Sequence, residues 1–240
     1  MKVYNESLEL RGGHVDQRGF WRPSAILDVM QEAAGSHANI LGIGANDLIK
    51  KGVVWILTRT EVEMITMPRL YDKVTLETFP TAPRRFFCPR YYVFKNEAGE
   101  EIGHASTLWA LLDFEKRAMV SPSIAAEHFP DTKALPLPMG MPATAGEVSA
   151  EPQAGCYVPV YTDMDVNNHV NNIHYIDWAC NALGFDTMRK KTLKHFIINY
   201  SREIREGQQI ETELRQDGDH FSFSGLHEGN RHFDIEGWLA

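Results

Sequence analysis

The sequence has few cysteines and no long apolar run. Only Cys88, Cys156 and Cys180 occur among 240 residues, far apart and without CxxC spacing. This odd, scattered set gives no disulfide framework and no zinc knuckle, so we expect a reducing compartment. No apolar run approaches the ~18 residues that a membrane helix needs, and the N-terminus lacks the apolar stretch of a signal peptide. We therefore expect a cytoplasmic, soluble protein without a membrane partner.

An excess of positive charge is also missing. The formal net charge is −8, which does not favour a nucleic-acid partner. The chain has no GxSxG, no P-loop and no GxGxxG after a strand, so none of these motifs indicates a serine nucleophile or a bound nucleotide. We expect no cofactor.

An internal repeat organises the chain. Placing Asp16 on Asp163, at an offset of 163 − 16 = 147, brings together two segments that pass from a polar loop into an apolar run at helical spacing. The alignment superimposes Ile26 on Ile173 and Val29 on Ile176. Each run stops at a Leu-Gly pair, 41–42 and 183–184, which predicts a left-handed helix end.

Strand patterns follow both predicted helices, separated by the turn segments KNEAGEE and HEGN. Each half therefore reads as one helix and several antiparallel strands. The predicted strands are 53–64, 73–79, 90–95 and 104–114 in the first half and 195–204, 209–214, 220–226 and 231–239 in the second.

Between the halves, residues 121–159 hold seven of the twelve prolines and read as a connector. We predict an α+β protein with a first unit at 1–130, a linker at 131–152 and a second unit at 153–240. A long apolar helix wrapped by a curved antiparallel sheet is the pattern of a hotdog fold, so the chain is predicted to be a double hotdog. Two unrelated α+β domains are the alternative.

The densest polar cluster begins the second repeat, in TDMDVNNHVNN. Asp165, Asn167 and His169 alternate, and in an extended loop alternate side chains point the same way. A carboxylate, an amide and an imidazole can orient water, donate to a carbonyl oxygen and move a proton. Asn171 or Asn172 is more typical of a helix N-cap.

This loop has one alternative interpretation, and the repeat provides a comparison for it. A metal site with His169, His174 and Asp165 as ligands is an alternative, but no clear further ligand completes it. At the offset of 147, Arg22 takes the place of His169 and Phe20 that of Asn167. The first half thus lacks the polar set, which favours one catalytic half and one half that holds an apolar tail.

Glu203 is the fourth candidate. It follows an apolar strand pattern and aligns with Glu61 in the first half. A charge on an apolar strand is costly unless paired, so we expect a catalytic role; an exposed strand face is the alternative. No metal is required by this set.

Two further sets of residues are candidates for binding a partner or a substrate. The basic run after the second helix either complements the end of that helix or docks an acidic partner; its members are Arg189, Lys190, Lys191 and Lys194. The residues expected to contact an apolar tail are Met30, Ala34, Trp55 and Leu57.

The second-half segment fits the pattern D-x-N-x-H-V-N-N-x-x-Y-x-x-W, and the first half contains DQRGFWRPSAILDVMQEAAGSHA. On these motifs, nearly the whole chain resembles the acyl-ACP thioesterases of bacteria and plants. The resemblance implies a double hotdog in which the second unit catalyses and the first holds the acyl chain. It carries the family's catalytic groups over to Asp165, Asn167, His169 and Glu203. Ile204 replaces a cysteine of the plant pattern, which argues against a thiol nucleophile there.

The resemblance further implies hydrolysis of a fatty acyl thioester on acyl carrier protein (ACP), with that carrier as partner. The absence of a transit peptide before the first unit is typical of a bacterial member. A hotdog thioesterase acting on coenzyme A thioesters and a non-catalytic acyl-binding module are the alternatives. Edge strands leave a homodimer possible.

Overall fold

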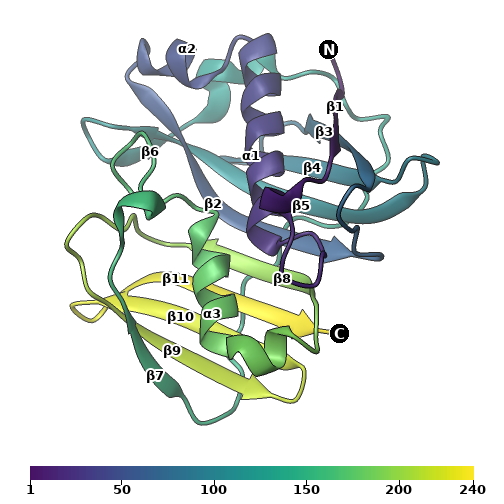
Figure 1. Ribbon diagram of the computed structural model, residues 1–240. Helices are drawn as coiled ribbons and strands as arrows, with labels where there is room; N and C mark the ends of the chain where they lie inside the picture. Colours follow the sequence, from purple (N-terminus) through teal and green to yellow (C-terminus); the bar gives the residue numbers. More distant parts are fainter.

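One continuous antiparallel sheet runs through the molecule, and two long helices pack side by side on one of its faces (Figure 1). The computed structural model describes residues 1–240. The strand order is β1-β3-β4-β5-β2-β8-β11-β10-β9-β7, and β6 pairs with β5. The first half forms β1 (Tyr4–Glu9), β2 (Val53–Met64), β3 (Lys73–Pro80), β4 (Phe87–Lys95), β5 (Glu101–Asp113) and β6 (Ala118–Val120). The second half forms β7 (Gln153–Tyr157), β8 (Leu193–Tyr200), β9 (Ile210–Asp217), β10 (His220–His227) and β11 (Asn230–Leu239).

The helices are α1 (Pro23–Ile40), α2 (Ala45–Ile49) and α3 (His174–Met188), with short 3₁₀ turns η1 (Gly12–His14), η2 (Pro122–His128) and η3 (Tyr161–Asp163). None of the helices is both long and apolar enough to cross a bilayer. α1 ends as expected, since Gly42 has φ 75° just beyond it. Gly184, with φ 80°, interrupts α3, and one more turn follows to Met188. The predicted stop in the second half is therefore a kink.

The halves are joined by backbone pairing of β2 with β8. Five residue pairs, from Arg59 with Asn199 to Glu63 with His195, connect them. A single cluster of 33 buried residues contains side chains from both halves, including Trp21 and Trp178. The two helix-plus-sheet units of the prediction are thus confirmed, and they share one core.

The segment after η2 contains neither helix nor strand until β7. Its backbone contacts side chains of the central strands: Arg59 Nη1 donates to Pro142 O (3.1 Å), and Ala143 N donates to Glu61 Oε2 (2.8 Å). Glu61 alternates along β2 with the core residue Val62, so this segment crosses the sheet on the face away from the helices. The division of the chain at 131–152 stays a prediction.

Backbone hydrogen bonds correct the register of the repeat. Asp16 N donates to Phe20 O (2.8 Å), and Asp165 N donates to His169 O (2.8 Å). The bridges that flank these turns, Val15 with Trp21 and Met164 with Val170, also match. Asp16 therefore corresponds to Asp165, at an offset of 165 − 16 = 149. The offset of 147 is wrong, and with it the pairing of Ile26 with Ile173 and of Val29 with Ile176.

The strands after the helices follow another offset. Trp21 N donates to Pro68 O (3.0 Å), and Val170 N donates to Ile204 O (2.8 Å). Pro68 thus corresponds to Ile204, at 204 − 68 = 136, and Glu203 to Met67. The predicted equivalence of Glu203 with Glu61 is wrong.

His37 gives the fold a pH dependence. Its side chain is fully buried in α1, and its Nδ1 accepts from Arg90 Nη1 (3.2 Å). Burial and the Arg90 charge lower the pKa of His37 from 6.5 to about 4. As pH falls, His37 is therefore protonated in the unfolded chain before it is protonated in the folded one. The contribution of His37 to the free energy of unfolding is complete above pH 6.5 and is lost as pH falls toward 4.

We predict that His37 alone lowers the free energy of unfolding by up to about 3 kcal/mol over this interval. Denaturant unfolding between neutral pH and pH 4.5 measures it, with His37→Gln as the non-titrating comparison. If the free energy of unfolding falls by the same amount with pH in both proteins, His37 does not cause the effect.

Candidate active site

A cavity of about 860 Å³ lies between the halves and has lining residues from both. Its first-half end is buried: Ala34 and Cys88 are 6% and 4% exposed. Its second-half end is open to solvent, since His169 and Glu203 side chains are 26% and 29% exposed. The four predicted catalytic residues all line this cavity: Asp165, Asn167, His169 and Glu203.

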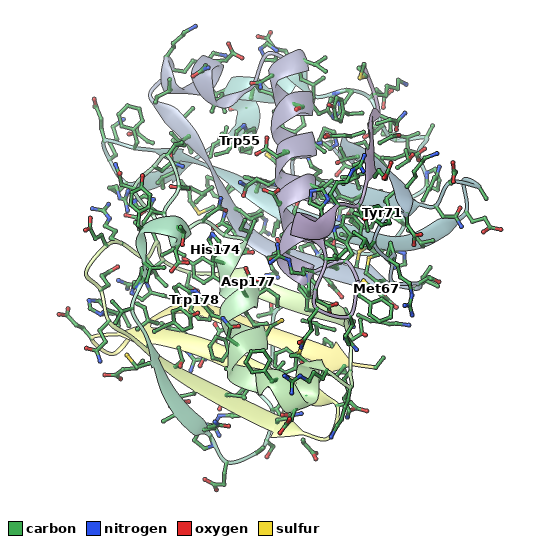
Figure 2. All side chains as sticks on the ribbon, in the orientation of Figure 1. Trp55, Met67, Tyr71, His174, Asp177 and Trp178 are labelled. Atoms are coloured by element: carbon green, nitrogen blue, oxygen red, sulfur yellow. The ribbon has the colours of Figure 1, made fainter.

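Three of the four residues predicted to contact the apolar tail line the cavity, and one lies in the core. Ala34, Trp55 and Leu57 line the cavity, and Figure 2 shows Trp55 beside α1 in the first half. Met30 is not among the lining residues; it is 2% exposed and packs in the common core. A β-bulge between Leu57 and Arg59 leaves Thr58, another lining residue, out of the ladder. Such bulges re-aim side chains beside binding sites.

The loop that carries the predicted catalytic residues Asp165, Asn167 and His169, here called the catalytic loop, is a tight turn closed by Asp165. Asp165 Oδ1 accepts from Asn167 N (2.7 Å) and His169 N (3.3 Å), and Oδ2 accepts from Asn167 Nδ2 (3.1 Å). Asn168 has φ 59°, a left-handed conformation that asparagine tolerates. The prediction of an extended loop with three alternating side chains is wrong, because the Asp165 carboxylate points back into its own loop.

Asp16 closes the same turn in the first half. Its Oδ1 accepts from Arg18 N (2.8 Å) and Phe20 N (3.0 Å). Asp16 makes the same hydrogen bonds as Asp165, although its half has no counterpart of Asn167 or His169. The aspartate is therefore needed to form the turn. We infer that Asp165 mainly positions Asn167 and His169.

The corrected register also changes which residues replace the reactive groups. Phe20 takes the place of His169, Arg18 that of Asn167, and Met67 that of Glu203; the earlier pairs with Arg22 and Phe20 are wrong. Met67 is 7% exposed and lies, with Tyr71, on the side of the first half away from Trp55 (Figure 2). The first half therefore keeps the turn and lacks the groups that can move a proton.

Glu203 follows the end of β8 and is not on a strand as predicted. Its Oε1 lies 3.7 Å from His169 Nε2 and accepts from Arg117 Nη2 (2.8 Å) and Arg205 Nη2 (2.6 Å). Burial raises the pKa of this carboxyl, but the two guanidinium groups more than offset it and lower the pKa below the usual value. Glu203 is thus an anion at neutral pH.

Sequence reasoning missed Arg117. It lies 86 positions from Glu203, in the turn between β5 and β6 of the other half. No local spacing connects the two residues, so only the tertiary structure reveals the contact.

This arrangement has a definite chemistry. The imidazole of His169 can take a proton from water, and the Glu203 carboxylate can stabilise the imidazolium that forms. Asn167 Nδ2 uses one hydrogen for Asp165 and keeps a second that can be donated to a carbonyl oxygen. Burial raises the pKa of Cys88, which lines the cavity, to about 12, so its thiol stays protonated and is a poor nucleophile.

Asn171 and His174 of the same segment make local structural contacts. Asn171 Oδ1 accepts from Ile173 N (3.3 Å) in the turn before α3, but Ile173 is the N-cap residue, so the predicted asparagine cap is wrong. His174 pairs with Asp177 on α3 (3.6 Å; Figure 2). No group of three or more His, Cys, Asp or Glu side chains can hold a metal ion.

The basic run lies at the other end of α3. Arg189 is the C-cap residue, and Lys191 bonds Asp219. None of Arg189, Lys190, Lys191 and Lys194 lines the cavity. α3 begins just after the catalytic loop, and the basic run follows its last residue, Met188.

Two family models match the chain. One, described as the acyl-ACP thioesterase N-terminal domain, matches residues 1–127, and the other, the C-terminal domain of the same enzymes, matches residues 147–234. Together they include most of the 240 residues. The chain therefore belongs to the acyl-ACP thioesterase family, as its motifs indicate.

Curated relatives are distant. The chloroplastic oleoyl-ACP thioesterase of Coriandrum sativum is 24% identical over 204 residues, which cover 78% of this chain and 55% of the relative. A chloroplastic palmitoyl-ACP thioesterase of Arabidopsis thaliana is 23% identical over 214 residues, which cover 84% of this chain and 52% of the relative. The chain thus spans little more than half the length of these relatives.

Similar structures establish the fold. An acyl-ACP thioesterase from Bacteroides thetaiotaomicron superposes with a TM-score of 0.88 at 21% identity, over 99% of this chain and 98% of the other. A 12:0-ACP thioesterase from Umbellularia californica superposes with a TM-score of 0.84 at 20% identity, over 99% and 97%. The predicted double hotdog fold is confirmed.

The position of Asp165 yields a testable distinction. Asp165→Asn keeps one acceptor oxygen for the loop, so we predict kcat/KM within about tenfold of wild type, the cost of a weakened hydrogen bond. Asp165→Ala removes every acceptor and should lose considerably more. Steady-state kinetics on a thioester substrate measure both variants.

Asp16→Ala is the matched control, because it opens the same turn in the half without reactive groups. It should lower thermal stability and leave kcat unchanged. If Asp165→Asn is as inactive as Asp165→Ala, the carboxylate itself takes part in the chemistry and the positioning role is wrong.

Proposed function

We propose that this protein hydrolyses the thioester of fatty acyl-ACP to free fatty acid and ACP, the reaction that terminates fatty acid synthesis. The observation that carries the proposal is the His169–Glu203 pair, 3.7 Å apart, at the open end of a cavity whose other end is buried in the first half. Family membership and relatives named oleoyl-ACP and palmitoyl-ACP thioesterase support the same substrate class.

In the proposed reaction the acyl chain occupies the first-half end, beside Ala34, Trp55 and Leu57. Asn167 donates a hydrogen bond to the thioester carbonyl oxygen, which becomes negative as water attacks. His169 accepts the proton of that water, and Glu203 stays anionic beside the imidazolium. When the C–S bond breaks, His169 returns the proton to the phosphopantetheine thiolate.

Two other functions are tested by simple comparisons. A coenzyme A thioester has the same reactive bond, so the carrier is distinguished by kinetics on both substrates. A non-catalytic acyl-binding module would bind acyl groups without releasing a thiol, but such a module has no use for an ionised Glu203 beside an imidazole. Docking of ACP at the basic run, a homodimer and a cytoplasmic location stay predictions.

The reactive residues define the central mutational prediction. His169→Ala should lower kcat by about 10²–10⁴-fold through loss of the proton carrier, and Asn167→Ala by about 10²–10³-fold through loss of the carbonyl donor. Glu203→Gln should fall in the same range as His169→Ala, since it removes the charge that stabilises the imidazolium. Release of free thiol from acyl-ACP measures all three.

The control is His104→Ala, because His104 on β5 pairs with Glu63 of β2 and Glu101 of β5 and does not line the cavity. It should keep wild-type turnover. Folded variants of His169, Asn167 and Glu203 that all turn over like wild type would refute the proposed site.

The cavity predicts control of chain length. Ala34→Leu adds three carbons to a side chain that faces the cavity, so the released fatty acids should become shorter. Met30→Leu nearly conserves volume in the core and should leave the profile unchanged. Free fatty acids produced in a bacterial host, separated by chain length, are the measurement. An unchanged profile for Ala34→Leu, or an equal shift for Met30→Leu, contradicts the cavity assignment.

A further inference from the structure

The turn between β5 and β6 is built to present Arg117. Asp113 Oδ1 accepts from Glu115 N (3.1 Å) and Lys116 N (2.9 Å), which ties the turn to the end of β5. Arg117 itself has φ 52°, a left-handed conformation that is uncommon outside glycine and worth a functional question. The chain thus holds Arg117 in an unfavoured conformation, from which its guanidinium reaches Glu203 in the other half.

Stability does not account for this contact. The Arg117 side chain is 58% exposed, and ion pairs at such exposed sites contribute little to stability. Arg205, from Glu203's own segment, already provides a guanidinium at 2.6 Å. A second cation brought from a distant turn therefore calls for a reason in the chemistry of Glu203.

The geometry provides that reason. Both guanidinium groups donate to Oε1 of Glu203, the oxygen nearest to His169 Nε2, while Oε2 has no partner in the protein. Two charged donors on the same oxygen restrict the position of that oxygen more than one donor would. A fixed carboxylate keeps its distance and direction to the imidazole through the reaction.

We propose that Arg117 is a positioning residue that the first half contributes to the catalytic pair: its guanidinium orients the Glu203 carboxylate beside His169. The acyl-binding half thereby completes the site. This inference rests on the proposed hydrolysis.

Charged and titratable groups surround Glu203 and bear on its protonation. They come from the catalytic loop, α3, β11, the segment of Glu203 itself and the β5–β6 turn. They are Asp165, His169, Tyr175, His232, Arg202, Arg205 and Arg117. Only Arg117 comes from the first half.

The test compares Arg117→Met with Lys116→Met. Lys116 is the neighbouring cation in the same turn; it is 80% exposed and pairs only with Asp113 (3.2 Å). The substrates are acyl-ACP and a short thioester without a protein carrier, each followed by thiol release across pH. Both variants remove one positive charge from the same surface, so any general electrostatic effect on the substrate is shared.

Arg117→Met should lower kcat about tenfold on both substrates with KM little changed, as expected when an interaction acts in the transition state. Loss of the cation favours the protonated form of the His169–Glu203 pair, and the reaction requires that pair unprotonated. The acid limb of the kcat profile should therefore move to higher pH, by up to about one unit. Arg117→Lys should restore much of kcat and of the profile, and Lys116→Met should match wild type.

The inference is overturned if Arg117→Met and Lys116→Met behave alike, or if Arg117→Met raises only KM for acyl-ACP, which would make Arg117 a docking residue. An Arg117→Met protein that does not fold is replaced by Arg117→Gln, which also removes the charge and for which an unshifted acid limb has the same meaning. If wild type itself releases no thiol from either substrate, the proposed function fails instead.

Discussion

The antiparallel pairing of β2 with β8 is the constraint on which the structure depends. Five residue pairs join the halves through their backbones, so one central ladder belongs to both halves. The pairing sets α1 beside α3 and merges both apolar faces into one core. It also gives the cavity one wall from each half, which is how a buried chamber in the first half meets polar groups of the second.

The duplicated loop shows how one scaffold supports two tasks. Asp16 and Asp165 accept equivalent backbone hydrogen bonds and close equivalent turns. At the next positions the halves diverge, with Phe20 where His169 lies and Met67 where Glu203 lies. The aspartate that closes the turn is thus present in both halves, and the groups proposed to carry the chemistry are present in the second half alone.

The sequence predicts much of this fold, because alternation and turn residues are local signals. β2 spans the predicted residues 53–64, and the polar cluster does line the cavity. The register of the repeat cannot be predicted from the sequence, because apolar residues recur every three to four positions in a helix. An alignment that is wrong by two positions therefore still places some apolar residues of one half on apolar residues of the other. Backbone hydrogen bonds fix the register. Glu203 was placed on a strand because nothing local marks the end of β8, where Ser201 N and Arg202 N both donate to His232 O. The Arg117 contact is wholly tertiary.

We propose that an imidazole–carboxylate pair in one half cleaves a thioester whose acyl chain is held by the other half and delivered by a carrier protein. The decisive experiment measures kcat/KM of the intact wild-type protein for acyl-ACP and acyl-CoA bearing the same acyl group. We expect release of one thiol per fatty acid and a clearly higher kcat/KM for acyl-ACP. Equal or greater efficiency on acyl-CoA, or tight acyl binding without thiol release, would contradict this proposal.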